Sequence, residues 1–131
     1  MFSKLELAQQ LFDYYTSRNV QGFISLLHPD IIWIEPGDSD IPYAGRFEGL
    51  AEVKMFLERV AINQQFTAFI LTDLCESLER VVAMGYSNAN VLSTGKSYHT
   101  DWAYALTFRQ EKISGVQVYM DTLAMAKANS R

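Results

Sequence analysis

The stretch that decides the fold runs through Trp33-Ile34-Glu35-Pro36-Gly37 and continues to Arg46-Phe47-Glu48-Gly49. It sets one carboxylate, Glu35, among apolar neighbours on a short predicted strand, directly before a proline–glycine break. A buried carboxylate must either be neutralised by a partner or take part in chemistry, and this placement is typical of a buried general base. The stretch therefore predicts a pocket whose wall includes Glu35.

Helical periodicity precedes and follows this strand. Apolar residues recur at three- and four-residue spacing with polar residues between them, which predicts amphipathic helices. The segments with this pattern are residues 4–17, 20–27 and 50–61. Ser3 followed by Glu6 fits a capping box at the start of the first helix. We expect Pro29 to end the second helix, because a residue before proline avoids the helical conformation, and the strand to run over 31–35.

After Asn63 the apolar period changes from helical to two, as in strands. The β-rich runs are residues 66–75, 80–92, 98–109 and 113–122. Short links join these runs, so they predict antiparallel hairpins. Helices followed by such a meander are typical of an α+β domain in which helices cover one face of a curved sheet. We interpret residues 1–131 as a single domain, with a frayed tail over 127–131.

Composition narrows the classes of partner. The chain carries a formal net charge of -4 and has no basic run, which argues against binding to nucleic acid. No stretch approaches the roughly 20 apolar residues that span a bilayer, so we expect no membrane partner. Cys75 is the single cysteine, which excludes an internal disulfide and a multi-thiolate metal site and fits a reducing compartment. These features together indicate a cytoplasmic protein.

Several short motifs occur in a specific order along the chain. They are His28-Pro29-Asp30, Gly45-Arg46-Phe47-Glu48-Gly49, Thr94-Gly95-Lys96-Ser97-Tyr98, Lys112-Ile113 and Val118-Tyr119-Met120-Asp121. With the helix order, they resemble the nuclear-transport-factor-2-like superfamily (NTF2-like, cystatin-like), and within it the SnoaL-like and ketosteroid-isomerase-like proteins. The resemblance implies a cone-shaped α+β fold, in which N-terminal helices cover the concave face of a curved antiparallel sheet. It also implies an apolar pocket inside the cone and a homodimer formed through the convex face.

The resemblance assigns roles to particular positions. In ketosteroid isomerases an Asp-Pro pair supplies the general base, and Glu35-Pro36 falls at that place with one extra methylene. Their oxyanion hole uses a tyrosine and a protonated aspartate, whose positions hold Leu11 and Thr100 here. The catalytic set of limonene-type epoxide hydrolases would fall on residues that cannot ionise, namely Ser87, Gly85 and Val118. Epoxide hydrolysis by that route is therefore disfavoured.

The pocket-facing residues are predicted from the same comparison and from the alternation of side chains in strands. The predicted lining is Trp33, Ser87, Thr100, Trp102, Tyr104, Val116, Val118 and Met120, with Gly85 beside it. Tyr14 and Tyr15 on the first helix can lend a hydroxyl to catalysis. The aromatic residues can stack on a planar or polycyclic ligand, or they can be plain core. Glu35 itself can be a free base, or it can pair with Arg46 or with backbone amides.

Two hypotheses for function follow. The first is a cofactor-independent isomerase or aldol-type cyclase, with Glu35 as the base next to a carbonyl group. The second is a non-catalytic module that binds an apolar small molecule or dimerises.

The two histidines lie far apart without a carboxylate cluster, so no metal site is expected, and no cofactor is implied. His99 and Asp101 share the opposite strand face and can act together only if the register is shifted by one residue.

Overall fold

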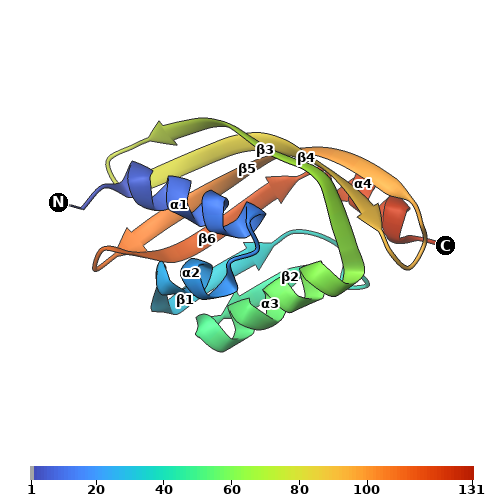
Figure 1. Cartoon of the computed structure of the whole chain (residues 1–131), viewed down its shortest axis with the longest axis horizontal. Coiled ribbons are helices and arrows are strands. Elements are labelled where there is room, and N and C mark those ends of the chain that lie inside the picture. The colour runs from blue at the N-terminus through green and yellow to red at the C-terminus, as the bar shows by residue number, and fades with distance from the viewer. Residues whose placement is uncertain (1) are drawn as a thin grey trace.

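A computed structural model of the chain describes residues 2–131, and it confirms the α+β class. One curved six-stranded sheet is covered on its concave side by the three N-terminal helices (Figure 1). The helices are α1 (Lys4–Thr16), α2 (Val20–Ser25), α3 (Gly49–Asn63) and α4 (Thr122–Asn129). The strands are β1 (Leu27–Glu35), β2 (Gly45–Glu48), β3 (Gln64–Glu76), β4 (Arg80–Val91), β5 (Ser97–Arg109) and β6 (Lys112–Met120). None of the helices formed by residues 2–131 is long and apolar enough to cross a membrane.

The first two helices begin at side-chain caps. Ser3 Oγ accepts a hydrogen bond from the Glu6 backbone N–H at 3.2 Å, as the capping-box pattern predicts. Asn19 caps α2, since its Oδ1 accepts from the Gly22 N–H at 2.8 Å. The second helix ends at Ser25, earlier than predicted, because the chain is extended from Leu27 onward as β1. The predicted start of this strand at residue 31 was therefore too late.

The sheet has the strand order β2-β1-β6-β5-β4-β3. The hairpins predicted from the short links are confirmed, since β3, β4, β5 and β6 pair antiparallel with one another in sequence. One pair departs from the antiparallel expectation: β1 runs parallel to β6, with Trp33 beside Val116. Pairing between segments so remote in the chain leaves no local signal in the sequence. The short β2 was also not predicted, and it pairs with β1 through Phe47 opposite Trp33.

The C-terminal segment is helical, and the prediction of a frayed tail over 127–131 was wrong. Asp121 caps α4, because its Oδ1 accepts from the Ala124 N–H at 3.0 Å. Met125 is fully buried in the core. The end of the helix is tied down by two hydrogen bonds, from Thr94 Oγ1 to the Ala128 carbonyl at 2.6 Å and from Asn129 Nδ2 to the Tyr43 hydroxyl at 2.9 Å. Packing against β5 thus orders a segment whose composition alone suggests mobility.

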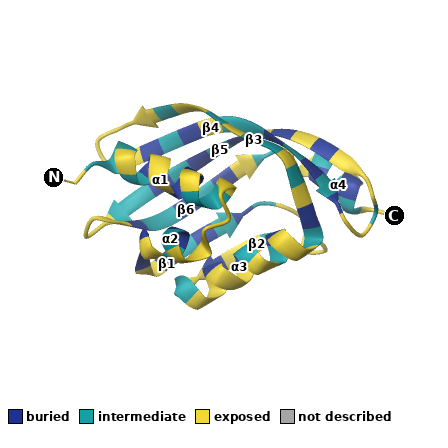
Figure 2. Cartoon of the chain, in the orientation of Figure 1, coloured by how far each residue is buried: buried dark blue, intermediate teal, exposed yellow. Residues whose placement is uncertain are grey.

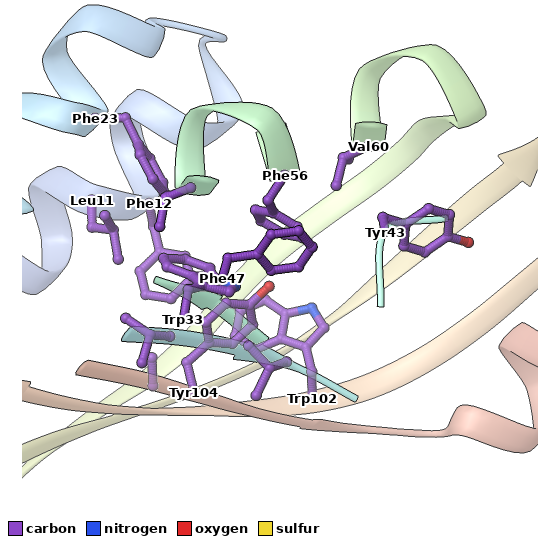
Figure 3. Close-up of a cluster of buried hydrophobic side chains, with 14 of the residues drawn as sticks. Leu11, Phe12, Phe23, Trp33, Tyr43, Phe47, Phe56, Val60, Trp102 and Tyr104 are labelled. Atoms are coloured by element: carbon purple, nitrogen blue, oxygen red, sulfur yellow. The ribbon is translucent and has the colours of Figure 1, made fainter. Parts of the chain in front are cut away.

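Burial alternates along the central strands, as a sheet with one covered face requires (Figure 2). On β5, Thr100, Trp102 and Tyr104 are buried, whereas His99 and Asp101 are exposed. This confirms the register predicted from the sequence. Most of the residues labelled in Figure 3 are aromatic, and they come from the helices, from the sheet and, in the case of Tyr43, from a loop.

Candidate functional site

Glu35 lies at the end of β1 and is 8% exposed. Its Oε1 accepts a hydrogen bond from Trp33 Nε1 at 3.0 Å, since residues two apart on a strand share a face. Arg46 does not reach it, because the Arg46 Nε binds Glu48 Oε1 at 2.7 Å on the exposed side of β2. Within residues 2–131, no lysine, arginine or histidine forms an ion pair with Glu35. The alternative in which Arg46 neutralises this carboxylate is therefore wrong.

The environment of Glu35 favours the protonated form. Burial raises the pKa of its carboxyl group from 4.5 to about 8, and the Trp33 hydrogen bond opposes this rise without cancelling it. A carboxyl group with a pKa of about 8 exchanges its proton near physiological pH. Glu35 can therefore both accept and return a proton under ordinary conditions.

Glu35 faces a small internal chamber with a volume of about 10 Å³. This volume admits one water-sized group. The chamber is lined by Tyr15, Glu35, Tyr43, Val60, Gln64, Phe66, Phe69, Ser87, Tyr98, Trp102, Tyr104, Val118 and Met120. The chamber wall thus combines polar groups (carboxyl, hydroxyl, amide and indole) with apolar side chains. The space that they enclose has room for one heavy atom of a ligand and the hydrogens on it.

A larger, half-open mouth of about 110 Å³ lies next to the chamber. It is formed by the end of α1, the start of α2, one side of α3 and the start of β3. Its lining is Tyr14, Tyr15, Arg18, Asn19, Val20, Phe23, Leu57, Val60, Ala61, Gln64 and Phe66. Only Arg18 among these carries a full charge. The mouth and the chamber share Tyr15, Val60, Gln64 and Phe66, which we call the gate.

Four tyrosines line the chamber together with Glu35. Burial raises the pKa of Tyr15, Tyr43, Tyr98 and Tyr104, and the charge of Glu35 adds to each rise. These phenols therefore stay neutral and remain hydrogen-bond donors at physiological pH. Tyr98 donates to Gln64 Oε1 at 2.6 Å. Glu35 is consequently the group in the chamber whose protonation changes near neutral pH.

The structure brings together most of the residues predicted for the pocket. Glu35 and Tyr15 line the chamber together with Ser87, Trp102, Tyr104, Val118 and Met120. Tyr14, the other predicted tyrosine, lies at the mouth, with its ring packed over Gly22. The two helix-α1 tyrosines therefore differ in position, since Tyr15 lines both the mouth and the chamber and Tyr14 lines the mouth alone.

Three predicted lining residues are buried but lie outside the chamber wall. Trp33 packs its ring against Phe23 and Phe56, with ring centroids 5.5 and 5.4 Å away. Val116 lies beside Trp33 on β6 and is 2% exposed. Thr100 has a structural task, since its Oγ1 donates to the Asp101 carbonyl at 2.7 Å and accepts from the Asp121 N–H at 2.8 Å. A side chain on the inward face of the sheet therefore does not necessarily line the chamber.

Other lining residues were not predicted. They are Tyr43, Val60, Gln64, Phe66, Phe69 and Tyr98. Tyr98 has the same parity on β5 as Thr100 and Trp102, so the alternation itself contained the signal for it. Phe66 and Phe69 have no such signal, because a register shift between Phe66 and Ala68 interrupts the alternation of β3. Tyr43 comes from a loop, where no periodicity applies.

His99 and Asp101 lie on the opposite face of the sheet from Glu35. The His99 Nε2 is 3.3 Å from Asp101 Oδ1, and Nδ1 is 2.7 Å from Asn88 Oδ1. Both side chains are exposed to solvent. Because the register is the predicted one, this pair does not reach the chamber, and the alternative in which it acts there is wrong.

The chain is similar to one family model and to several solved structures. A family model for the SnoaL-like domain matches residues 8–116. No curated protein matches the sequence. An NTF2-like protein from Burkholderia xenovorans LB400 is 27% identical, with 97% of this chain and 95% of that chain covered and a TM-score of 0.88.

Two further structures show the same fold at lower identity. An NTF2-like protein from Burkholderia thailandensis E264 is 20% identical over the whole of both chains, with a TM-score of 0.90. TerC, co-crystallised with polyporic acid, is 23% identical, with 95% of this chain and 96% of that chain covered and a TM-score of 0.78. The NTF2-like architecture predicted from the sequence is thereby confirmed.

Proposed function

This chain belongs to the SnoaL-like domain family, and on that premise we propose that it binds a small cyclic carbonyl compound and moves a proton next to the carbonyl group. Glu35 is the base in this proposal. The ring of the ligand occupies the mouth, and its carbonyl oxygen passes the gate into the chamber. No cofactor takes part in the reaction. TerC, which shares the fold, was co-crystallised with polyporic acid, and this supports the proposal of an organic ligand.

The observation that carries the proposal is the state of Glu35. Its side chain is buried, and the one hydrogen bond that its carboxyl group makes within the described residues comes from Trp33. The pKa of the carboxyl group is raised to about 8. At pH 7 about one molecule in ten has Glu35 ionised, and the buried carboxylate of that fraction is a stronger base than an ordinary carboxylate because it is poorly solvated. A carboxyl group held only for structure would gain stability from a cation or from several donors.

The proposed step conserves atoms and electrons. Glu35 takes a proton from the carbon next to the carbonyl group, so the C–H bond breaks and a carboxyl O–H bond forms. The electron pair of the C–H bond forms a carbon–carbon double bond, and the carbonyl π electrons move to the oxygen as an enolate. The protonated Glu35 then returns its proton to a carbon, either the same one or a conjugated one further along. The second outcome isomerises a β,γ-unsaturated ketone to the α,β-unsaturated ketone.

The mouth sets the size of the ligand. A cavity of about 150 Å³ holds benzene, and the mouth has about 110 Å³ and is open on one side. This space fits one ring whose substituents extend into solvent. The structure thus favours a single-ring ligand over the polycyclic ligand considered from the sequence.

Cyclohex-3-enone is a suitable test substrate, because it is a single ring that yields the conjugated cyclohex-2-enone after one proton shift. We expect the protein to accelerate this conversion and to exchange the transferred hydrogen with deuterium in heavy water, as followed by proton NMR. Glu35→Gln should lower the rate at least about a hundredfold, because the amide cannot accept the proton. Glu58→Gln, which changes an exposed carboxylate on α3, serves as the matched control. Equal rates for the native protein and Glu35→Gln would remove Glu35 from the mechanism.

A second candidate is a non-catalytic binding module, and the small volume of the chamber favours it. In that case a ring compound binds in the mouth and never passes the gate. The same experiment separates the two functions. If the protein is only a binding module, the native protein and Glu35→Gln should bind cyclohex-3-enone with equal affinity. Neither protein should then isomerise the compound faster than buffer alone does.

A further inference from the structure

Trp102 contains an unusual buried polar atom. Its Nε1 is the one buried side-chain nitrogen or oxygen without a hydrogen-bond partner among residues 2–131. The residue is only 5% exposed, and its indole lines the chamber that Glu35 also faces. Trp33 shows the ordinary arrangement, because its Nε1 donates to Glu35. A buried N–H group without a partner is costly and rare, so its presence in the chamber wall requires an explanation.

The indole of Trp102 is held firmly in this position. It stacks on Phe12 and Phe69, with ring centroids 5.6 and 4.9 Å away and interplanar angles of 3° and 27°. Tyr104 contacts it edge-on at 4.9 Å. On its other side lies Gly85, where an added Cβ would be only 2.7 Å from the indole Cη2. These contacts prevent the ring from turning to find another acceptor, so the direction of its N–H is set before any ligand arrives.

We propose that Trp102 Nε1 donates a hydrogen bond to the carbonyl oxygen of the bound ligand and stabilises the negative charge that forms there when Glu35 removes a proton. This inference rests on the proposed function. The N–H bond of Trp102 stays intact, so the residue supplies electrostatic stabilisation and no proton. A fixed donor in a chamber without bulk water is well suited to this role, because it needs no reorganisation during the reaction.

Two further observations support the assignment. The chamber of about 10 Å³ has room for one oxygen-sized group, which matches a carbonyl oxygen. Thr100, at the position that the family resemblance gives to an oxyanion donor, uses its hydroxyl for Asp101 and Asp121 instead. A donor for the oxygen must therefore come from a residue that does line the chamber, and the buried N–H of Trp102 has no acceptor among residues 2–131.

The test uses a matched pair of probes, cyclohexanone and methylenecyclohexane. The two have nearly the same shape, but only the ketone offers an acceptor. Titration of ¹⁵N-labelled protein follows the indole N–H signals of Trp33 and Trp102, which are distinguished by their contacts with different rings, Phe56 for Trp33 and Phe69 for Trp102. We expect cyclohexanone to move the Trp102 N–H signal downfield and methylenecyclohexane to leave it nearly unchanged. A movement of the Trp33 signal alone, or equal effects of the two probes on Trp102, would overturn the inference.

A substitution tests the same point through affinity. In the native protein we expect cyclohexanone to bind about tenfold more tightly than methylenecyclohexane, as for one buried hydrogen bond, and in Trp102→Phe the two affinities should be equal. A preference that survives in Trp102→Phe contradicts the assignment. If Trp102→Phe does not fold, the NMR titration of the native protein with the two probes decides whether Trp102 is the donor.

The outcomes also separate this inference from the proposed function. If neither probe binds, both are overturned. If cyclohexanone binds and cyclohex-3-enone is isomerised while the Trp102 signal stays in place, only the role of Trp102 is lost. Glu35→Gln should bind cyclohexanone with the same shift of the Trp102 signal, because the hydrogen bond does not depend on the base.

Discussion

The indole N–H of Trp33 donates to the carboxyl Oε1 of Glu35 at 3.0 Å, across two positions of the same strand face. This bond favours the ionised form of Glu35, whereas burial favours the protonated form, and burial has the larger effect on the pKa. The carboxyl group is thus held in one orientation while it keeps a proton affinity near neutrality. Orientation and proton affinity are the two properties that a general base requires.

The first prediction concerns stability and pH. The pKa of Glu35 in the folded protein, about 8, lies above its ordinary value of 4.5, so the folded chain binds this proton more tightly than the unfolded chain does. The stabilisation is complete below the unfolded pKa and is lost as the pH rises toward the folded pKa. We expect urea unfolding to show a loss of about 4 kcal/mol between about pH 5 and about pH 9 that is absent in Glu35→Gln. The same pH dependence in both proteins would contradict the raised pKa.

The second prediction concerns the Trp33 hydrogen bond. Trp33→Phe keeps an aromatic ring in the core but removes the N–H that lowers the pKa of Glu35. The pKa of Glu35 should therefore rise further above 8, as measured by carbon NMR titration of its carboxyl group. Trp102→Phe is the control, since its N–H makes no hydrogen bond to Glu35. A lower pKa in Trp33→Phe would show that water enters and solvates the carboxylate.

The third prediction concerns the convex face of the sheet, on which the sequence pattern predicts Val82, Met84, Tyr86 and Leu92. Met84 and Leu92 are 38% and 55% exposed, and Tyr119 from β6 adds a side chain that is 59% exposed. We expect a homodimer through this face, because exposed apolar groups gain free energy when they leave water. Sedimentation at micromolar concentration should give a dimer for the native chain and a monomer for Met84→Lys. Ile62→Lys, at a 72% exposed position on α3, should remain a dimer.

The fourth prediction concerns charge at the mouth. Arg18 follows α1 with a φ of 60°, a backbone conformation that usually belongs to glycine, and it makes no ion pair within the described chain. An acidic substituent on a ring bound in the mouth would therefore meet an available cation. Cyclohexanecarboxylate should bind more tightly than its uncharged amide, by about fivefold at low salt, and Arg18→Gln should abolish the difference.

The control for this prediction is Arg80→Gln, which removes an exposed positive charge at the start of β4. Isothermal titration of the acid and the amide with each variant measures the effect. A preference for the acid that persists in Arg18→Gln, or that disappears in Arg80→Gln, would mean that the overall charge of the protein decides the selectivity.

The sequence alone determined the features that depend on neighbouring residues. The sequence correctly predicted the cap at Ser3, the alternation that turns Trp102 and Tyr104 inward, and the place of Glu35 at the end of a strand. Each follows from spacing along the chain, because the period of a helix or a strand and the reach of a capping side chain are local properties. The inward face of the sheet is therefore encoded in the local pattern of residues.

Only the tertiary structure decided which inward residues reach Glu35 and how much space remains beside it. The parallel pairing of β1 with β6, the docking of α4 and the inclusion of Tyr43 from a loop join segments that are remote in sequence. Such contacts depend on the packing of whole elements, which no local period encodes. The same packing leaves a single oxygen-sized space in the chamber and, among the buried side chains of residues 2–131, one N–H without a partner, that of Trp102.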